Sequence, residues 1–454
     1  MCWFFFSAYY KNLLLKKILR WEDNCLVVFD EAHHCIKNHP FNQLLQEYHR
    51  KYPQNVRPKL LGLTASPAGR STVQETVSML HQLIYNLGGA MIALVEENTY
   101  ELKKYQSNAT MEINYTAMTR KEKSFKEELQ IYLLNCYTRV CEETDLLQQF
   151  DLGLKAKKDL TAEQLLKCAK EVDGSLLNSL EITINMASPK EDSKFDRKIF
   201  SRNLIKHTQY ICIALNVLIE SGIQMAIEEL QELMAIDPAT SFEFADVNGL
   251  PCTRMKDALQ TCMNVERSSV PLHSHEFDTS PQLSKLIEIV TRTDYVNWSN
   301  KGVMVLVLVK KRETAFKIKN MLNSHDAIEK LQLNVEAVVG HGSTSGTEQG
   351  MSVAQQKKIL ENMQKKQYHI VVATAVAEEG IDIPECELVI TFNPPSTVTA
   401  LVQMRGRARK NHSKFIILCN SSKEKVEFED LMMKEKNMIE AAEQIIKEQK
   451  IKKI

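Results

Sequence analysis

Short apolar runs that do not alternate with polar residues recur near the start of the chain. Residues 26–30 (LVVFD) and 59–64 (KLLGLT) form two such runs, and residues 90–95 (AMIALV) form a third. Strands buried on both faces have this composition, whereas strands with one wet face alternate. The stretches between the runs are long enough for crossover connections. This pattern predicts an α/β fold with a parallel sheet.

The same alternation of apolar runs and helical stretches returns from about residue 284. A charged helical tail with an apolar stripe follows from residue 423. The chain therefore predicts a second α/β lobe with its own parallel sheet. Its candidate strands cover residues 303–309, 335–340, 369–373, 388–392 and 414–418.

The middle of the chain, about residues 119–270, has a helical texture. Phe125, Leu129, Tyr132 and Cys136 follow one another at spacings of three and four, which places them on one helix face. No motif with recognisable chemistry occurs here, so we expect an all-α spacer or clamp. The predicted domains are 1–115 (remainder of the first lobe), 116–275 (helical insertion), 276–422 (second lobe) and 423–454 (C-terminal charged helix).

Composition restricts the classes of protein to consider. The formal net charge is +0, so any nucleic-acid site must be a local patch. The 11 cysteines are odd in number and form no C-x-x-C pair, which favours reduced thiols in the cytoplasm over a disulfide framework. We expect no signal peptide at the apolar start and no transmembrane helix, because every apolar run is shorter than about 18 residues.

His33, His34, Cys35 and His39 form a cluster with the residue types of a zinc site. A second ligand pair at zinc-finger spacing is lacking, so we expect no zinc here.

Asp30 and Glu31 end the first apolar run. Ligands of open parallel sheets bind outside the carboxyl ends of the strands. An aspartate there can hold Mg²⁺ through water and a neighbouring glutamate can orient an attacking water, although an ordinary helix N-cap also favours Asp. Thr64 and Ser66 end the second run and can hydrogen-bond to these acids or to His33, but alone they would indicate only a Ser/Thr turn.

Two further polar segments follow strands of the second lobe. The first contains Thr374, Gly380 and Asp382, and its glycine lets the backbone approach a phosphate or ribose closely. The second, residues 403–410 (QMRGRARK), places three arginines around Gly406, and their planar groups suit phosphate. An arginine run is also typical of a solvated face or a localisation signal.

In order, these segments resemble the motifs of superfamily 2 helicases: DEAH motif II, TAS motif III, VLVLVKKRETA motif IV, ATAVAEEGIDIP motif V and QMRGRAR motif VI. The segments GHGSTSGTEQGMSVAQQKKILENM and AEEGIDIPECELVITFNPPST, with the long helical insertion, resemble the Dicer and RIG-I-like group. The resemblance extends from about Tyr9 to Lys447. It implies two RecA-like lobes, the first incomplete, with an all-α insertion that grips double-stranded RNA.

Fork-remodelling DNA helicases related to the Fanconi anaemia translocase are the nearest alternative, since they share the helical insert and the EEGxDI loop. Met404 and the sequence RGRAR fit the RNA-directed branch better. The tail KVEFEDLMMKEKNMIEAAEQ favours a Dicer-like over a RIG-I-like member. The resemblance therefore implies an ATP-dependent helicase or translocase acting on double-stranded RNA, in RNA silencing or antiviral defence.

The resemblance also implies a role for each candidate site residue, with ATP and Mg²⁺ as cofactors. Asp30 would hold the Mg²⁺ through water, and Glu31 would position the hydrolytic water. Gln403 would contact the γ-phosphate region, and Arg405 and Arg407 would be arginine fingers.

The remaining candidates would act from the second lobe or between the lobes. Gly380, Asp382 and Arg409 would approach the nucleotide. The residues that would contact nucleic acid or couple hydrolysis to lobe movement are His33, Thr64, Ser66 and Thr374.

One part of the family pattern is missing. A G-x-x-x-x-G-K-[ST] phosphate loop does not occur in the 454 residues. That loop supplies a nest of backbone N–H groups, a lysine and a Mg²⁺-binding hydroxyl. We therefore expect an N-terminally truncated helicase with impaired ATP hydrolysis, whose first sheet has unpaired edges and an exposed apolar face. A non-catalytic RNA-binding or regulatory protein and a chain that does not fold stably are the alternatives.

Overall fold

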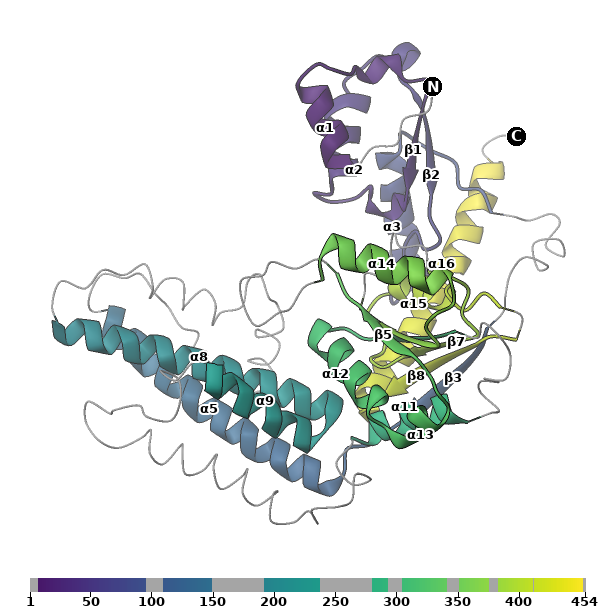
Figure 1. Ribbon diagram of the computed structural model, residues 1–454. Helices are drawn as coiled ribbons and strands as arrows, with labels where there is room; N and C mark the ends of the chain where they lie inside the picture. The colour runs from purple at the N-terminus through teal and green to yellow at the C-terminus, as the bar shows by residue number, and fades with distance from the viewer. Residues whose placement is uncertain are drawn as a thin grey trace. The chain divides into compact units, whose positions relative to one another are not determined.

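Figure 1 shows the computed structural model of the chain. Contacts between residues divide it into two compact units, Met1–Tyr115 with Arg292–Ile454, and Thr116–Thr291. The structure describes residues 7–94, 109–148, 192–236, 280–292, 304–340, 351–374, 383–410 and 412–451.

The larger sheet of the first unit has six parallel strands. The four strands between its edges are almost entirely buried, as the continuous apolar runs predict. The predicted α/β fold with parallel sheets is therefore confirmed. The strand order is β3 (Thr110–Tyr115), β8 (Lys414–Cys419), β7 (Leu388–Thr391), β4 (Val305–Leu308), β6 (Ile370–Ala373) and β5 (Val335–Val338).

Helices cover both faces of this sheet (Figure 1). The helices are α12 (Arg312–Asn323), α13 (Asp326–Lys330), α14 (Val353–Gln364), α15 (Val398–Arg405) and α16 (Ser422–Ile451). On one face, α14, α15 and α16 bury Met363, Leu401 and Phe428 in a cluster that includes Phe415 of β8. Helix α12 packs against β5 and β6 with residues outside this cluster, which places it on the other face.

The smaller sheet of the same unit pairs β1 (Leu26–Asp30) with β2 (Lys59–Leu63) in parallel. One face packs through Phe29 against a cluster that contains Tyr10 and Trp21. The opposite face carries four apolar side chains that are 45–52% exposed, so the exposed apolar face expected from the sequence is present. These four residues are Leu26, Val28, Leu61 and Leu63. The accompanying helices are α1 (Ser7–Leu15), α2 (Pro40–Leu44), a π-helical turn (Leu45–His49) and α3 (Val73–Asn86).

Helix α16 joins the two sheets of this unit. Its first half buries Phe428 and Met438 against the six-stranded sheet. Its second half buries Ala441 and Ile445 against Leu80 of α3. One long helix with an apolar stripe therefore packs on both parts.

Two segments differ from the sequence-based expectation. Residues 90–94 form no strand, because the side chain of Gln449 in α16 accepts from Ile92 N at 3.1 Å and donates to Ala90 O at 3.5 Å. Strand β3 lies within the range predicted for the first lobe, yet it pairs with β8 of the second. It alternates apolar and polar residues, as a strand at a sheet edge with one covered face does.

The described elements of the second unit are helices: α5 (Arg120–Gln148), α8 (Asp192–Ser221), α9 (Ile223–Ile236) and α11 (Pro281–Thr291). The four residues placed on one helix face by their spacing, Phe125, Leu129, Tyr132 and Cys136, are all buried in one apolar cluster. Throughout the described parts of the chain, each helix is too short or too polar to cross a membrane.

Candidate functional site

The carboxyl ends of β1 and β2 lie side by side, since Asp30 pairs with Leu63 in the parallel register. Asp30 is exposed, and its Oδ1 accepts a hydrogen bond from Glu31 N at 3.1 Å. Mg²⁺ in nucleotide sites keeps several waters and is held by one or two carboxylates together with the phosphates. An exposed aspartate at a strand end fits that requirement.

Glu31 adopts a left-handed backbone conformation, with φ 52° and ψ 51°. This conformation costs a non-glycine residue on the order of 1–3 kcal/mol. The turn also packs tightly on β2, because a Cβ added at Gly62 would lie 2.8 Å from the Cβ of Ala32. The backbone therefore fixes the direction in which the Glu31 side chain leaves the end of the strand.

His33 links the two strand ends. Its Nδ1 lies 3.1 Å from Thr64 Oγ1 and 3.2 Å from Glu31 Oε2. Ser66 N donates to the same Thr64 hydroxyl at 3.2 Å. The Glu31 carboxylate, the His33 ring, the Thr64 hydroxyl and the Ser66 backbone N–H therefore form one hydrogen-bonded group.

Helix α15 brings a residue of the arginine-rich segment to this group. The helix begins after Thr397, whose Oγ1 accepts from Ala400 N at 3.1 Å. One helical turn later, Gln403 Nε2 donates to Glu31 Oε1 at 3.3 Å. Two segments that are 372 residues apart in sequence thus meet at one carboxylate.

The three arginines of this segment have different surroundings. Arg405 forms a two-pronged ion pair with Glu435 of α16, with N–O distances of 3.1 and 2.5 Å. Arg407 is half-buried, and Arg409 is exposed with its Nε donating to Gly406 O at 2.9 Å. Glu435 therefore holds the guanidinium of Arg405 against α16.

We expect Arg405→Ala and Glu435→Ala each to lower the free energy of unfolding by about 1–3 kcal/mol, because each leaves a partly buried charge without its partner. The double variant should lose less than the sum of the two, with a coupling energy of about 0.5–3 kcal/mol. Urea unfolding of the four proteins measures this coupling. The exposed Arg409→Ala is the control, and strictly additive losses would show that the ion pair contributes nothing.

The remaining sequence-predicted residues lie at the second lobe. Thr374 follows β6, is 5% exposed, and its N donates to Val338 O at 3.2 Å. Gly380 and Asp382 lie outside the residues that the structure describes.

The histidine cluster does not have the geometry of a zinc site. The rings of His34 and His39 are stacked, with centroids 4.6 Å apart and planes at 14°, so their in-plane lone pairs cannot meet at one ion. Cys35 is fully buried, and burial raises the pKa of its thiol to about 12. Across the described ranges, no three His, Cys, Asp or Glu side chains are grouped to hold a metal ion.

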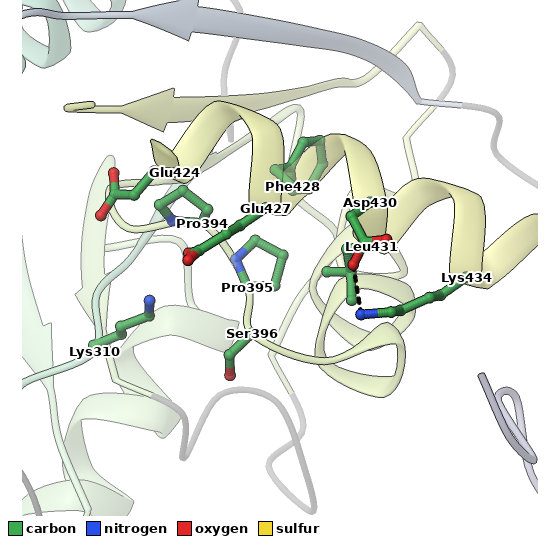
Figure 2. Close-up of a pocket in the computed structure, with 10 residues that line it drawn as sticks. All are labelled: Lys310, Pro394, Pro395, Ser396, Glu424, Glu427, Phe428, Asp430, Leu431 and Lys434. Atoms are coloured by element: carbon green, nitrogen blue, oxygen red, sulfur yellow. Dashed lines mark ion pairs between the residues drawn. The ribbon is translucent and has the colours of Figure 1, made fainter. Parts of the chain in front are cut away.

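A separate cavity of about 250 Å³ lies between α16 and the loops that follow β4 and β7 (Figure 2). Phe428 and Leu431 form its apolar side, and Lys434 is paired with Asp430 at 2.5 Å. Among the residues that the structure describes, its lining includes none of the predicted site residues, so Asp30 does not lie in this cavity.

A protein-family model matches the second lobe of the chain. Residues 282–412 match the family described as helicase conserved C-terminal domain. This part of the chain is a helicase C-terminal domain. The predicted resemblance to superfamily 2 helicases is therefore confirmed, and the match includes both Thr374 and Gln403.

Similarity to helicase-bearing proteins extends over most of the chain. It is 26% identical to protein Dicer of Schizosaccharomyces pombe over 434 residues, which covers 94% of this chain and 27% of that protein. It is 24% identical over 407 residues to the human antiviral innate immune response receptor RIG-I, covering 87% and 41%. The chain thus spans about a quarter to two fifths of the length of these relatives.

The crystal structure of the Pyrococcus furiosus Hef helicase domain has a similar fold. The match has a TM-score of 0.50 at 22% identity and covers 92% of this chain and 76% of that one. It supports the helicase fold and no further property.

Sequence reasoning did not identify the partners that complete the site. Thr399 accepts from Ser66 Oγ at 2.6 Å, and Glu435 binds Arg405. Both contacts join residues that are far apart in sequence, so no local spacing indicates them. The packing of α15 on the segment after β2 forms the first contact, and the packing of α15 on α16 forms the second.

Proposed function

We propose that this chain is the helicase module of a Dicer-like or RIG-I-like protein, which handles Mg-ATP and acts on double-stranded RNA in RNA silencing or antiviral defence. The hydrogen bond from Gln403 to Glu31 carries the proposal, because it joins the acidic strand end to the arginine-rich segment. The similarity to Dicer and RIG-I supports the class of substrate.

In the proposed site, each residue has a role that its surroundings permit. Asp30 holds Mg²⁺ through water, and Glu31 orients the attacking water from its strained turn. Gln403 positions the γ-phosphate region. Arg405 and Arg407 act as arginine fingers, and Arg409 approaches the nucleotide with its planar guanidinium group. Bound Mg²⁺ neutralises the charge on the phosphate oxygens.

We further propose that these 454 residues hydrolyse ATP weakly. Phosphate loops cradle the β- and γ-phosphates with backbone N–H groups and a lysine, and no such loop occurs in this sequence. Nucleotide binding then depends on Mg²⁺ at Asp30 and on the arginines of the second lobe.

We propose that the helical unit between Thr116 and Thr291 contributes to the recognition of double-stranded RNA. Proteins recognise double-stranded RNA through its backbone shape and 2′-hydroxyls. Such contacts are largely electrostatic, so affinity should fall steeply as salt increases.

The decisive experiment compares ligands on the purified chain. Blunt RNA duplex, DNA duplex and single-stranded RNA of one length are titrated by fluorescence anisotropy at two salt concentrations, with and without Mg²⁺ and a labelled ATP analogue. We expect RNA duplex to bind most tightly and the analogue to bind only with Mg²⁺. Equal affinity for DNA duplex would favour the fork-remodelling alternative. RNA binding without any nucleotide binding would favour a non-catalytic RNA-binding protein.

We expect Glu31→Gln to leave RNA-duplex affinity unchanged and to lower single-turnover, RNA-stimulated hydrolysis by roughly 10²-fold, since the group that orients water is lost. Excess protein over labelled ATP makes weak turnover measurable. Glu443→Gln, an exposed change on α16, is the matched control. Equal rates in the two variants would remove Glu31 from the proposed mechanism.

A further inference from the structure

The loop of residues 66–71, which we name the seat loop, follows β2 and is held by the helicase C-terminal domain and α16. Ser66 is 3% exposed and Ala68 is 6% exposed, so the first half of the loop is largely buried, whereas Arg70 and Ser71 are exposed. Buried polar groups are stable only when they are hydrogen-bonded.

Helix α15 makes the first contact with the seat loop. Ser66 Oγ donates to Thr399 Oγ1 at 2.6 Å. Thr399 precedes Gln403 by four positions, so both side chains lie on one face of the helix. The same helix face therefore contacts Ser66 at one point and Glu31 at the other.

The hydrogen bonds at Ser66 and at Glu31 differ in length and in exposure to solvent. The Ser66–Thr399 bond is 2.6 Å long, and Ser66 is buried. The Gln403–Glu31 bond is 3.3 Å long, and the side chain of Glu31 is 35% exposed. The contact at Ser66 is therefore tight, whereas the contact at Glu31 is open to solvent and to a ligand.

Gly69 brings the backbone of the seat loop close to both helices. A Cβ added there would lie 2.7 Å from Val398 Cγ2 and 3.4 Å from Lys434 O. Real Cβ atoms do not approach another carbon as closely as 2.7 Å, so a larger residue at position 69 overlaps the Val398 side chain unless that side chain moves or is replaced.

Helix α16 makes the remaining contacts. Asn437 is 9% exposed, and its Nδ2 donates to Arg70 O at 3.2 Å and to Ser71 O at 2.9 Å. One buried amide thus satisfies two backbone carbonyls of the loop. Ala68 packs in the same cluster as Ala441 of α16.

We propose that the seat loop is a permanent pivot. The two halves of the nucleotide site, the β1–β2 strand ends and helix α15, rotate about this loop and do not separate there. Gly69 and Asn437 are the positioning residues that hold the contact closed. The Glu31–Gln403 side then opens to admit nucleotide while the Ser66–Thr399 side stays packed. The pivot's role in nucleotide handling rests on the proposed function, whereas the closed seat itself does not.

A cross-link between Gly69 and Val398 tests the proposal. The ideal Cβ at position 69 lies 3.2 Å from Val398 Cβ, close to the roughly 3.5–4.5 Å that a disulfide spans. The variant G69C/V398C is oxidised with glutathione disulfide and the linked peptide is quantified by mass spectrometry, with G69C and V398C alone as controls. We expect the same cross-link yield without ligand, with Mg-ATP analogue and with RNA duplex.

The cross-linked protein is also expected to bind each ligand within about threefold of the reduced protein, since the proposed movement leaves this contact intact. A ligand that suppresses the cross-link, or a cross-link that abolishes binding until dithiothreitol is added, would show that the seat opens and overturn the pivot. If the unmodified chain binds neither ligand, the proposed function fails. The seat is then judged by cross-link yield and by slow amide exchange in residues 66–71, and low yield or fast exchange overturns it.

Two substitutions in the native background check the positioning residues. Gly69→Val introduces a steric overlap, and Asn437→Asp places a carboxylate against two carbonyl oxygens. Each substitution should speed amide exchange in residues 66–71 at least about tenfold. Arg70→Ala, which keeps the backbone carbonyl that Asn437 binds, should not. Equal exchange in all three variants would remove Gly69 and Asn437 as positioning residues.

Discussion

Replacing Phe415 with alanine is expected to lower the free energy of unfolding of the six-stranded sheet by about 3–5 kcal/mol. Phe415 is fully buried in β8, where it pairs with Met111 of β3 and Val389 of β7. Its ring lies in the cluster that α15 and α16 complete, so alanine leaves a cavity beneath both helices. Because α15 carries Gln403, the loss should also disorder the candidate site.

Urea unfolding with hydrogen exchange resolved for β7 and β8 measures this loss, because a chain of two units does not unfold in one step. Val426→Ala is the control, since Val426 is 62% exposed on α16 and should change stability by no more than about 0.5 kcal/mol. A similar small effect for Phe415→Ala would mean that the sheet and its helices do not form the single core described here.

The helical unit is expected to lose about 3 kcal/mol of stability between pH 6.5 and pH 4. Burial lowers the pKa of His207 to about 4 from its ordinary value of 6.5, and its Nε2 lies 2.7 Å from Tyr132 Oη. The unfolded chain binds a proton in this range while the folded chain does not. The neutral imidazole therefore contributes full stability above pH 6.5, and that contribution is lost as pH falls through 4.

Amide exchange of α5 and α8 in the full chain at several pH values measures this dependence. His207→Gln should flatten the slope, because glutamine does not titrate. His81→Gln, an exposed change in the other unit, should leave the slope unchanged. A slope that persists in His207→Gln would assign the acid sensitivity to other groups.

The local pattern of the sequence was enough to predict the parallel sheets. Continuous apolar runs mark strands buried on both faces, and β4, β6 and β7 are buried along their whole length. Periodic spacing likewise placed Leu129 and Cys136 on the buried face of α5. These features depend on neighbours in the chain, so they can be read without a structure.

Chain order alone was misleading at two places. The apolar residues 90–94 have the composition of a strand, yet Gln449 binds their backbone from α16. Strand β3 lies far from the other strands of its sheet in sequence, and only its pairing with β8 shows which sheet it completes. In both cases the partner is distant, so local composition could not indicate it.

The candidate site divides in the same way. The sequence by itself determined which residue types stand at the strand ends, because strand ends and residue chemistry are local properties. These residues are the acids at 30 and 31, the hydroxyls at 64 and 66 and the arginine-rich segment. Only the tertiary structure decided their partners: it pairs Glu31 with Gln403 and Arg405 with Glu435, and it seats Ser66 on Thr399. Hydrogen bonds and ion pairs form between atoms about 3 Å apart, and the fold sets that distance for residues that are 30 to 372 positions apart in the chain.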